Sequence, residues 1–436
     1  MIDGFAGTIL VPGSEDYPVA ATAFGTLGSP AVIARPTNAA DASAAVRYAR
    51  AQGLPLAVRS GGHSPFSTND GGMVLDLRDI RGVEVLAGNR VRVGSGAIWG
   101  DVALELQPYG LAISSGDTYS VGVGGLTLGG GIGWLVRQQG LAIDSLREAE
   151  VVLADGDIVT ASATAEPELF WALRGGGGNF GVVTRFTFQA HPLPGVIAGS
   201  IDVDPALLAD TLHDWRDVMR RAPEELNSTV IAMPVFGPGM PVVTKILVCF
   251  GGDDAGQALT AIQPLLDLPG VRTEDVAPKP YLEMLEQGTP APAPMRMVTH
   301  NGFASDLDDG LIARLAATHA GFSAVGAATL MLRYLRGAFN RMPADATAVA
   351  YRDAEAFVVS AAFLPPDAPA DAEARIQDGW GAVADAMPGV YGNFTPYPDS
   401  ETITSMYPPA TAERLRAAKR HYDPDNVLAS NHNIVP

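Results

Sequence analysis

The chain contains very little cysteine and no long apolar segment. Cys249 is the single cysteine among 436 residues, and it lies in the apolar run 247–250. One cysteine excludes a disulfide framework and a cysteine-rich metal site, so we expect Cys249 to be a buried core residue. No run of about 18 apolar residues could span a bilayer, and the N-terminus has no signal-peptide pattern. These absences predict a soluble, cytoplasmic protein with no membrane partner.

Positive charge is also scarce. The 29 lysines and arginines are outnumbered by 48 aspartates and glutamates, which gives a formal net charge of −19. Binding to nucleic acid requires a basic surface, so a nucleic-acid partner is excluded and an anionic membrane is disfavoured. The seven histidines show no metal-ligand spacing, and we predict no metal site. With 47% hydrophobic and 18% charged residues, the chain can form the cores of two domains.

Glycine, by contrast, is abundant, with 49 residues concentrated between positions 60 and 181. The first cluster follows a predicted short strand at 56–58 and consists of Arg59, Ser60, Gly61, Gly62, His63 and Ser64. Adjacent glycines allow successive backbone N–H groups to point at one anion. A histidine in such a turn can be a ligand, a base or a covalent attachment point. The segment predicts a phosphate-binding turn, although an ordinary surface turn would have the same composition.

Two further glycine clusters occupy residues 121–133 and 174–181, and seven glycines lie between 122 and 133. Glycine is required where a side chain would collide with a ligand or where φ is positive. We therefore interpret these clusters as backbone that approaches one large ligand. The alternative is close packing of chain segments on one another.

The third cluster also has the spacing G-x-G-x-x-G at Gly176, Gly178 and Gly181. The dinucleotide-binding fingerprint requires a strand before this motif and a helix after it. Here the order is reversed, with a predicted helix at 168–173 and a predicted strand at 181–188. This order argues against a Rossmann domain and a nicotinamide dehydrogenase.

Hydrophobic periodicity changes once along the chain, near the proline-rich segment 191–195. Before it, short helices alternate with short strands and hairpins. After it, longer amphipathic helices and apolar strands prevail, and a proline-rich loop is predicted at 290–294. The elements that we predict are helices at 39–52 (N-cap Asn38), 101–107, 205–221 and 411–421; strands at 73–77, 91–93 and 242–250; and hairpins turning at 88–89 and 155–157.

Several motifs together resemble one known family. They are the segments 32–36, 59–64, 121–133, 177–184, 346–353, 391–394 and 422–426. In order and spacing they are similar to the FAD-dependent oxidases of the p-cresol methylhydroxylase/vanillyl-alcohol oxidase superfamily, in the bacterial part of its berberine-bridge-enzyme-like branch. The resemblance implies an α+β fold with a two-part FAD-binding domain at 1–195 and 389–436. The intervening residues, 196–388, would form a substrate domain of antiparallel sheet covered by helices.

The resemblance also implies how FAD is held. In this family the histidine at the position of His63 is bonded to the 8α-methyl group of the flavin, and a neutral imidazole is a competent nucleophile for that bond. Many relatives carry a second flavin-linked cysteine at the position of Thr118, so only the histidyl bond is expected here. The predicted cofactor-binding residues, beyond the six of the first cluster, are Gly116, Asp117, Val121, Gly122, Gly124, Gly125, Gly131, Gly133, Gly178, Asn179, Gly181, Val183, Asn431 and Asn433.

The chemistry implied is hydride removal from a carbon bearing an alcohol or amine, with O2 reduced to H2O2. Val121 favours oxygen access and hence an oxidase over a flavin dehydrogenase. Tyr391 is the first catalytic candidate and Tyr351 the second, although a phenol pKa of about 10 is high for a base. The substrate would be a small alcohol, sugar or amine; a flavoprotein without turnover is a further alternative. His432 replaces a common glutamine, and we expect His300 and His319 to be surface or loop residues.

Overall fold

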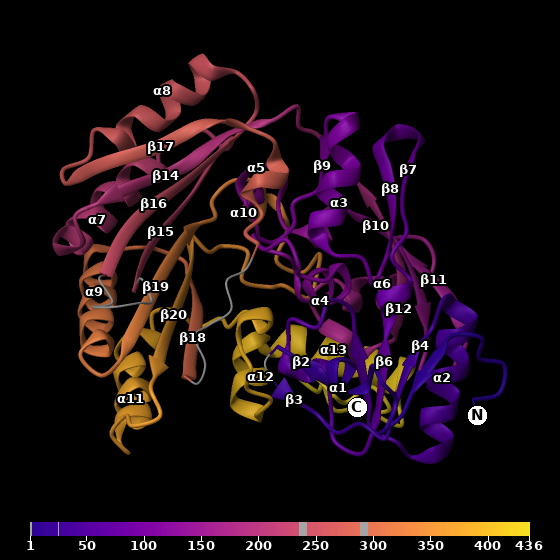
Figure 1. The fold of residues 1–436 in the computed structure, drawn as a ribbon. Helices are drawn as coiled ribbons and strands as arrows, with labels where there is room; N and C mark the ends of the chain where they lie inside the picture. The colour runs from indigo at the N-terminus through magenta and orange to yellow at the C-terminus, as the bar shows by residue number, and fades with distance from the viewer. Residues whose placement is uncertain (1, 25, 235–241, 288–294) are drawn as a thin grey trace.

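The computed structural model describes residues 2–24, 26–234, 242–287 and 295–436 of the chain. The predicted loop at 290–294 lies outside the described residues. Three larger sheets, with helices around them, make up most of the fold (Figure 1).

The N-terminal residues form a four-stranded sheet and one long helix. Its elements are β1 (Thr8–Leu10), β4 (Val32–Arg35), α2 (Ala39–Gln52), β5 (Leu56–Arg59) and β6 (Met73–Asp76), with α1 (Tyr17–Ala21), β2 (Thr22–Ala23) and β3 (Thr26–Leu27) before β4. Strands β4, β6 and β5 run parallel, and β1 joins the edge antiparallel. Helix α2 is confirmed as predicted: Asn38 accepts a hydrogen bond from the Asp41 N–H at 2.9 Å.

A five-stranded antiparallel sheet follows, in the order β11-β10-β12-β8-β7. Its strands are β7 (Val83–Leu86), β8 (Arg90–Gly94), β10 (Leu146–Val152), β11 (Ile158–Ser162) and β12 (Val182–Gln189), and a small pair is made by β9 (Leu111–Ala112) and β13 (His191–Pro192). Both predicted hairpins are confirmed. The turns lie at Gly88 and Asn89, which have positive φ, and at Gly156.

Short helices connect these strands. They are α3 (Trp99–Leu106), α4 (Val123–Gly129), α5 (Val136–Gln139) and α6 (Pro167–Leu173). Helix α6 precedes the third glycine cluster and β12 follows it, so the order that argues against a Rossmann domain is confirmed. Helix α4, which lies within the second glycine cluster, was not predicted because glycine is a poor helix former.

The third sheet has seven antiparallel strands in the order β17-β14-β16-β15-β19-β20-β18. They are β14 (Val196–Val203), β15 (Leu226–Pro234), β16 (Val242–Gly251), β17 (Val271–Lys279), β18 (Arg296–Ala304), β19 (Ala327–Tyr334) and β20 (Ala356–Leu364). Helices cover one face of it: α7 (Leu208–Met219), α8 (Ala255–Leu266), α9 (Asp309–Ser323) and α11 (Ala372–Ala384). The opposite face, called the inner face below, points toward the rest of the molecule (Figure 1).

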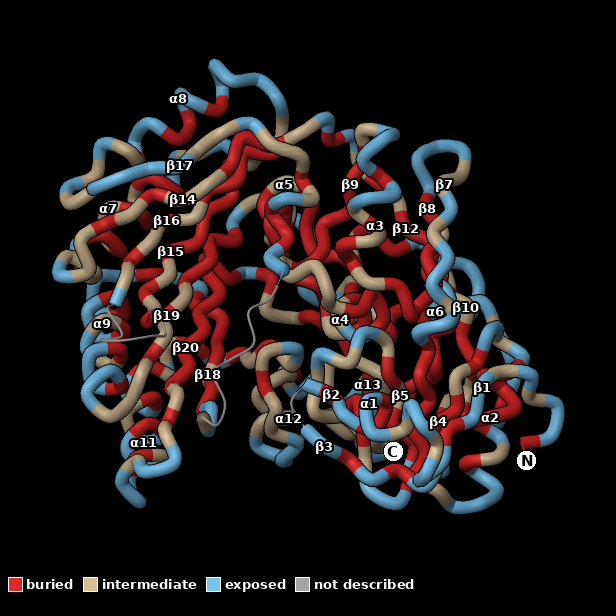
Figure 2. The backbone as a smooth tube through the Cα atoms, in the orientation of Figure 1, coloured by how far each residue is buried: buried red, intermediate tan, exposed pale blue. Residues whose placement is uncertain are grey.

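Along β16 and β19, buried residues that face the helices alternate with residues of the inner face, most of which are only partly buried (Figure 2). On β16, Ile246 and Val248 join the core under the helices, whereas Cys249 packs near Trp134 on the inner face. The burial of Cys249 is confirmed. The predicted helix at 205–221 begins as a single 3-10 turn and continues as α7.

The prediction that His300 and His319 are surface or loop residues is wrong. His319 lies on α9 and is buried, and His300 lies on β18 with its ring stacked on Trp380 at 5.1 Å between centroids. Packing of α9 and α11 against the sheet encloses both rings, which neither local sequence indicates.

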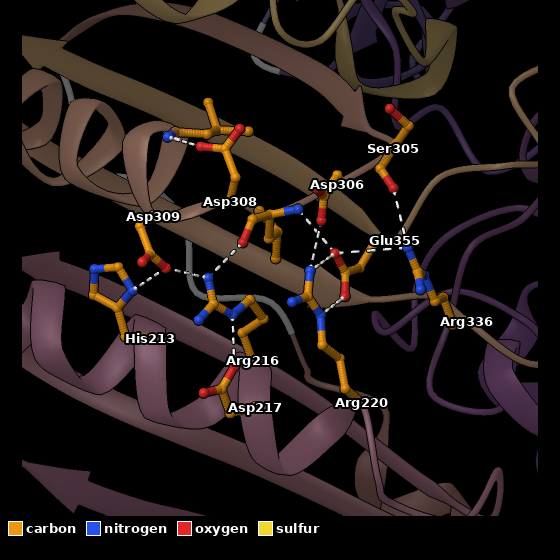
Figure 3. A network of polar contacts seen from close by, with 12 residues as sticks. His213, Arg216, Asp217, Arg220, Ser305, Asp306, Asp308, Asp309, Arg336 and Glu355 are labelled. Atoms are coloured by element: carbon orange, nitrogen blue, oxygen red, sulfur yellow. Dashed lines mark hydrogen bonds and ion pairs between the residues drawn. The ribbon is translucent and has the colours of Figure 1, made fainter.

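A network of charges fastens α7 to the loop before α9 and to the start of β20 (Figure 3). The carboxylate of Glu355, which is fully buried, accepts hydrogen bonds from Arg220 Nε at 2.6 Å and Nη2 at 2.7 Å, and from the Leu307 N–H at 2.8 Å. Beside it, Arg216 pairs with Asp309 at 2.7 Å. The charges of the helical layer are thus paired where it meets the sheet.

The C-terminal residues return to the N-terminal part (Figure 1). The short helix α10 (Ala338–Arg341) precedes β20, while α12 (Ser400–Met406) and α13 (Pro409–Tyr422) follow α11. Lys419 of α13 is buried, and its Nζ donates to Asp423 Oδ2 at 2.7 Å, to the Asn179 carbonyl at 2.9 Å and to the Leu428 carbonyl at 3.1 Å. One buried ammonium therefore joins α13, the third glycine cluster and the chain end.

Candidate active site

The first and second glycine clusters pack on one another, backbone against backbone. A Cβ on Gly61 would lie 2.3 Å from the Gly122 nitrogen, and one on Gly122 would lie 2.0 Å from the Gly61 nitrogen. Ser60 Oγ donates to the Ser95 carbonyl at 2.6 Å and accepts from the Gly124 N–H at 3.1 Å. The turn at 59–64 is therefore fixed directly onto the start of α4.

At several glycines of the second cluster a side chain would collide with the protein itself, and Gly131 also has a positive φ of +86°. A Cβ on Gly124, Gly131 or Gly133 would lie 2.5 Å or less from protein atoms: Ser95, Ala142 and the Ser115 carbonyl, respectively. Close packing of chain segments, the alternative given above, therefore applies at these three positions. Gly125 differs, because a Cβ there would meet no described atom within 4 Å. Contact of these residues with FAD stays a prediction.

The side chain of Arg59 and the backbone conformation of Gly62 determine the shape of the first turn. The Arg59 guanidinium is buried and donates to the Ser67 carbonyl at 2.9 Å and to the Ala20 carbonyl, with Asp76 at 4.0 Å. Gly62 has φ +77°, a conformation that other residues rarely adopt. The side chain of Arg59 thus holds the turn in place and leaves its backbone for any contact with a ligand. Ser64 Oγ accepts from the Phe66 N–H at 3.3 Å.

His63 lies exposed on this turn. Its Nε2 is 2.9 Å from Ser120 Oγ, which belongs to the segment that leads into α4. Desolvation by the surrounding protein lowers the pKa of His63, so its imidazole is neutral at neutral pH. A neutral ring held by one hydroxyl is suited to act as a nucleophile.

The third cluster is tied to the chain end by Asn179. This buried side chain donates from Nδ2 to the carbonyls of Gly176 at 2.8 Å and His432 at 3.2 Å, and its Oδ1 accepts from the Ile434 N–H at 3.0 Å. Gly178 lies beside Asn431. Asn179 therefore positions the chain end, a role that its place in the motif does not reveal.

Three side-chain atoms on this chain end are buried and have no hydrogen-bond partner among the described residues. They are Asn431 Oδ1, His432 Nε2 and Asn433 Oδ1. The His432 ring also packs edge-on against Phe66, 4.9 Å between centroids, so the chain end reaches the region of the first turn. Buried polar atoms left unpaired are costly and indicate a polar ligand.

A pocket lies where these segments meet. It is bordered by parts of the third glycine cluster, by the chain end and by both tyrosine candidates. The lining includes Gly129, Gly175, Gly176, Gly177, Asn179, Phe303, Val349, Tyr351, Tyr391, Asn393, Tyr407, Asn431 and His432. Gly129 and His432 both line this pocket, although they are more than 250 positions apart in the sequence.

Tyr391 is buried, and its hydroxyl accepts two hydrogen bonds. The donors are the Gly131 N–H at 2.7 Å and Asn393 Nδ2 at 2.9 Å. Burial nevertheless raises the pKa of Tyr391 to about 12. The phenol is therefore protonated at neutral pH, and the catalytic role of Tyr391 stays a prediction.

Tyr351 borders the same pocket with its hydroxyl turned outward. The hydroxyl donates to the Ser405 carbonyl on α12 at 3.1 Å, and the ring stacks on Phe303 at 6.0 Å between centroids. Burial raises the pKa of Tyr351 as well. Its neighbour Arg352 binds both carboxylate oxygens of Asp144, at 2.9 and 2.8 Å. The hydroxyl of Tyr351 is thus directed at α12.

Asp117 connects the second glycine region to the inner face of the seven-stranded sheet. Its Oδ2 pairs with Arg333 Nη2 at 3.0 Å, and Arg333 Nε donates to Thr229 Oγ1 at 3.0 Å. The guanidinium also lies 4.9 Å from the centre of the Trp134 ring. No sequence motif marked Arg333, because only the strand register brings it to Asp117. The neighbouring Gly116 packs against Leu126.

The remaining predicted cofactor residues lie mainly within the protein framework. Val183 is buried on β12, and a Cβ on Gly181 would lie 2.3 Å from Val151. Val121 is half-buried, and its carbonyl accepts from the Trp99 N–H at 2.9 Å. Their contact with a cofactor is not tested by these neighbours and stays a prediction.

These residues fit an FAD molecule. The unpaired acceptors of Asn431 and Asn433, the open position at Gly125 and the neutral His63 belong to segments that converge. Within the described ranges, no group of three histidine, cysteine, aspartate or glutamate residues could hold a metal ion. No helix in the described parts is long and apolar enough to cross a membrane.

Comparison with known proteins agrees with this fit. Residues 30–162 match the model of an FAD binding domain. The chain is 32% identical to (R)-6-hydroxynicotine oxidase of Paenarthrobacter nicotinovorans, over 94% of this chain and 92% of that protein. It belongs to the berberine-bridge-enzyme-like FAD-linked oxidases. Another member, chitooligosaccharide oxidase of Gibberella zeae, is 29% identical over 93% of this chain and 87% of its own length.

Solved structures of this oxidase family superpose over nearly the whole chain. The structure of 6-hydroxy-D-nicotine oxidase from Arthrobacter nicotinovorans matches with a TM-score of 0.87 and 30% identity, covering 99% of this chain and 98% of that one. Glucooligosaccharide oxidase from Acremonium strictum matches at 0.86 and 25% identity, covering 99% and 97%. The predicted fold class and family are confirmed, and the chain is an FAD-linked oxidoreductase that acts on a small molecule.

Proposed function

We propose that this oxidoreductase removes a hydride and a proton from a carbon–oxygen or carbon–nitrogen unit, CH–OH or CH–NH, and transfers the two electrons to O2. The substrate loses two hydrogens and O2 becomes H2O2, so atoms and electrons balance. The observation that carries the proposal is one pocket lined by Tyr391 and by the unpaired side chains Asn431 and His432, with the first turn connected to it through the contact of Phe66 with His432. The relatives named as oxidases of 6-hydroxynicotine and of chitooligosaccharide support it.

When bound, FAD supplies the two-electron acceptor, and the chain supplies its attachment and surroundings. We infer that FAD is held by residues 1–195 and 389–436 and is covalently attached through His63 only. Thr118 offers no thiol, and burial raises the pKa of the Cys249 thiol to about 12 on the far β16. The related glucooligosaccharide oxidase carries both a cysteinyl and a histidyl link.

The residues 196–388 would hold the substrate, on the inner face of the seven-stranded sheet. Tyr391, protonated at neutral pH, would orient the reacting group by hydrogen bonding. The cluster of Phe303, Phe357, Tyr391 and Phe394 rings around it would exclude water.

The test is production of the holoprotein, denaturation in acid and inspection of the polypeptide for flavin fluorescence in a gel. We expect the fluorescence to stay with the wild-type chain and with Cys249→Ser, and to be lost in His63→Ala. Flavin that washes off the wild-type chain would contradict the covalent link.

The oxidase reaction is tested separately, with a panel of small alcohols, sugars and amines under air. We expect stoichiometric H2O2 from the substrate that reduces the flavin. Rapid flavin reduction with slow reoxidation by O2 and fast reoxidation by a dye would favour the alternative, a flavin dehydrogenase of the same fold.

A further inference from the structure

Two buried polar groups on the inner face are left unpaired, and both lie on β18 beside Tyr391. Asn301 is 5% exposed, and its Nδ2 has no hydrogen-bond partner within the described parts of the chain. Thr299 is 9% exposed, and the same holds for its Oγ1. Because side chains two positions apart on a strand share one face, these groups lie next to each other.

The orientation of the Asn301 amide is fixed by its other end. Its Oδ1 accepts from the Tyr391 N–H at 2.7 Å, which only the oxygen can do, so the unpaired end is the NH2 group with its two donors. Thr299 is covered by Tyr397, whose hydroxyl accepts from the Thr299 N–H at 3.4 Å. Both side chains are thus held close to the segment that carries Tyr391.

Across the inner face, Asn301 and Thr299 each begin a row of residues that are paired between neighbouring strands. Asn301 pairs with Val359, Val359 with Met331, and Met331 with Ile231. This row is apolar apart from Asn301, and Val359 and Met331 contact the cluster that contains Tyr391. In the next row, Thr299 pairs with Ala361 and Ala361 with Thr329.

The charged groups around this surface are already paired. Lys245, the register partner of Ile231, binds Asp202 at 2.6 Å, and Arg333 binds Asp117 at 3.0 Å. The surface therefore offers apolar contact and, at one end, the neutral donors of Asn301 and Thr299.

We propose that Asn301 and Thr299 form an anchor for a hydrogen-bond acceptor on the substrate, whose remaining body is apolar and lies on Val359, Met331 and Ile231. This inference rests on the proposed function and names its substrate class: a compact, largely apolar alcohol or amine with one acceptor, such as a ring nitrogen or a carbonyl. An oligosaccharide would bury many hydroxyls for which the two rows provide few partners. Asn301 would also couple substrate binding to Tyr391, because one amide holds both.

The anchor is tested by binding of two matched probes, 3-pyridinemethanol and benzyl alcohol, which differ by one ring nitrogen; cellobiose is the sugar probe. Binding to the holoprotein is followed anaerobically by the change in flavin absorbance, which does not require turnover. We expect wild type to bind the pyridyl probe about fivefold more tightly than the phenyl probe, the difference that one hydrogen bond of usual strength gives, and cellobiose the most weakly.

The variants are Asn301→Asp, which keeps an acceptor for the Tyr391 N–H but replaces the donors, and Thr299→Val. In both variants we expect the ratio of the dissociation constants of the two probes to be close to one. Thr244→Val is the control, because Thr244 Oγ1 is equally buried and unpaired but pairs in register with Val203 on the helix-covered side. It should leave the ratio unchanged.

Equal binding of the two probes by wild type, a ratio unchanged in both variants, a preference for cellobiose or no absorbance change with any probe would overturn the anchor. Failure of the proposed function has a different signature, namely a protein that binds no FAD or yields no H2O2 with any substrate. Thermal unfolding of each variant beside Thr244→Val establishes that the proteins compared are folded.

Discussion

The loops around His63 and the inner face of the seven-stranded sheet are built in different ways. In the loops, backbone lies against backbone, and side chains such as Arg59, Ser60 and Asn179 are engaged in holding the loops together. On the inner face the backbone is regular, and the identity of each alternate side chain decides what the surface offers. A shared cofactor can therefore be held by a constant framework, while the substrate is selected by a few exchangeable residues.

The largest effect is expected from Gly122→Ala, which tests whether the loops form one packed unit. The added methyl would lie 2.0 Å from the Gly61 nitrogen, and the backbone there cannot move without displacing the His63 turn. We expect the free energy of unfolding to fall by about 3 kcal/mol or more, as urea unfolding would measure. We also expect a greatly reduced FAD content, as flavin absorbance would measure. Gly321→Ala is the control: this exposed glycine lies within α9, a Cβ there would meet no described atom within 4 Å, and the change should be neutral or slightly stabilising. If Gly122→Ala keeps the FAD content of the wild type, the loops do not act as one packed unit.

The next effect concerns the helical layer of the sheet. Burial disfavours the charged form of Glu355, but the hydrogen bonds from Arg220 and Leu307 outweigh it and hold its pKa below the ordinary value. Its stabilisation is therefore complete at neutral pH and is lost as the pH falls below about 4.3, through the folded-state pKa.

Glu355→Gln should destabilise by about 3 kcal/mol at pH 7, the low end for a broken buried pair because the Arg220 side chain is 34% exposed. The difference from wild type should shrink in acid, as urea unfolding at several pH values would measure. A difference that is constant with pH would mean that Glu355 is not charged in the folded protein.

Tyr391 contacts both regions, because its hydroxyl accepts from the Gly131 N–H and its own N–H donates to Asn301. A smaller effect is expected from Tyr391→Phe. Loss of the hydroxyl leaves the Gly131 N–H without its acceptor, so we expect a loss of about 1–3 kcal/mol in stability and a several-fold decrease in kcat. Because the pKa of Tyr391 is raised to about 12, the pH profile of kcat between 6 and 9 should keep its shape in the variant. A limb of the profile that disappears with the hydroxyl would instead identify Tyr391 as the base.

The smallest effect is expected from Ser120→Ala. The ring of His63 would lose the hydrogen bond that fixes Nε2, worth about 1 kcal/mol, which corresponds to about a fivefold slower attachment of FAD. The rate of attachment is measured by supplying apoprotein with FAD and following the appearance of acid-stable fluorescence.

The contrast between the two regions also explains what the sequence could predict. Helix α2, the hairpins and the order of elements around Gly176 follow from local patterns, and the family motifs predict the cofactor segments. The contacts of Arg333 and Asn301 could not be predicted, because they depend on the register of strands far apart in sequence. The reason for the glycines of the second cluster could not be decided from the sequence, since sequence cannot distinguish close packing of the chain from close approach of a ligand.

The buried Lys419 has a consequence for how the protein matures. Its ammonium requires the Asp423 carboxylate and the carbonyls of Asn179 and Leu428, so Asn179 in the third glycine cluster gains this contact only when α13 and the chain end are in place. During synthesis the N-terminal sheets emerge first and wait for these partners. We therefore expect the flavin to be captured only after translation of the last residues, which makes an intact C-terminus a condition for the holoenzyme.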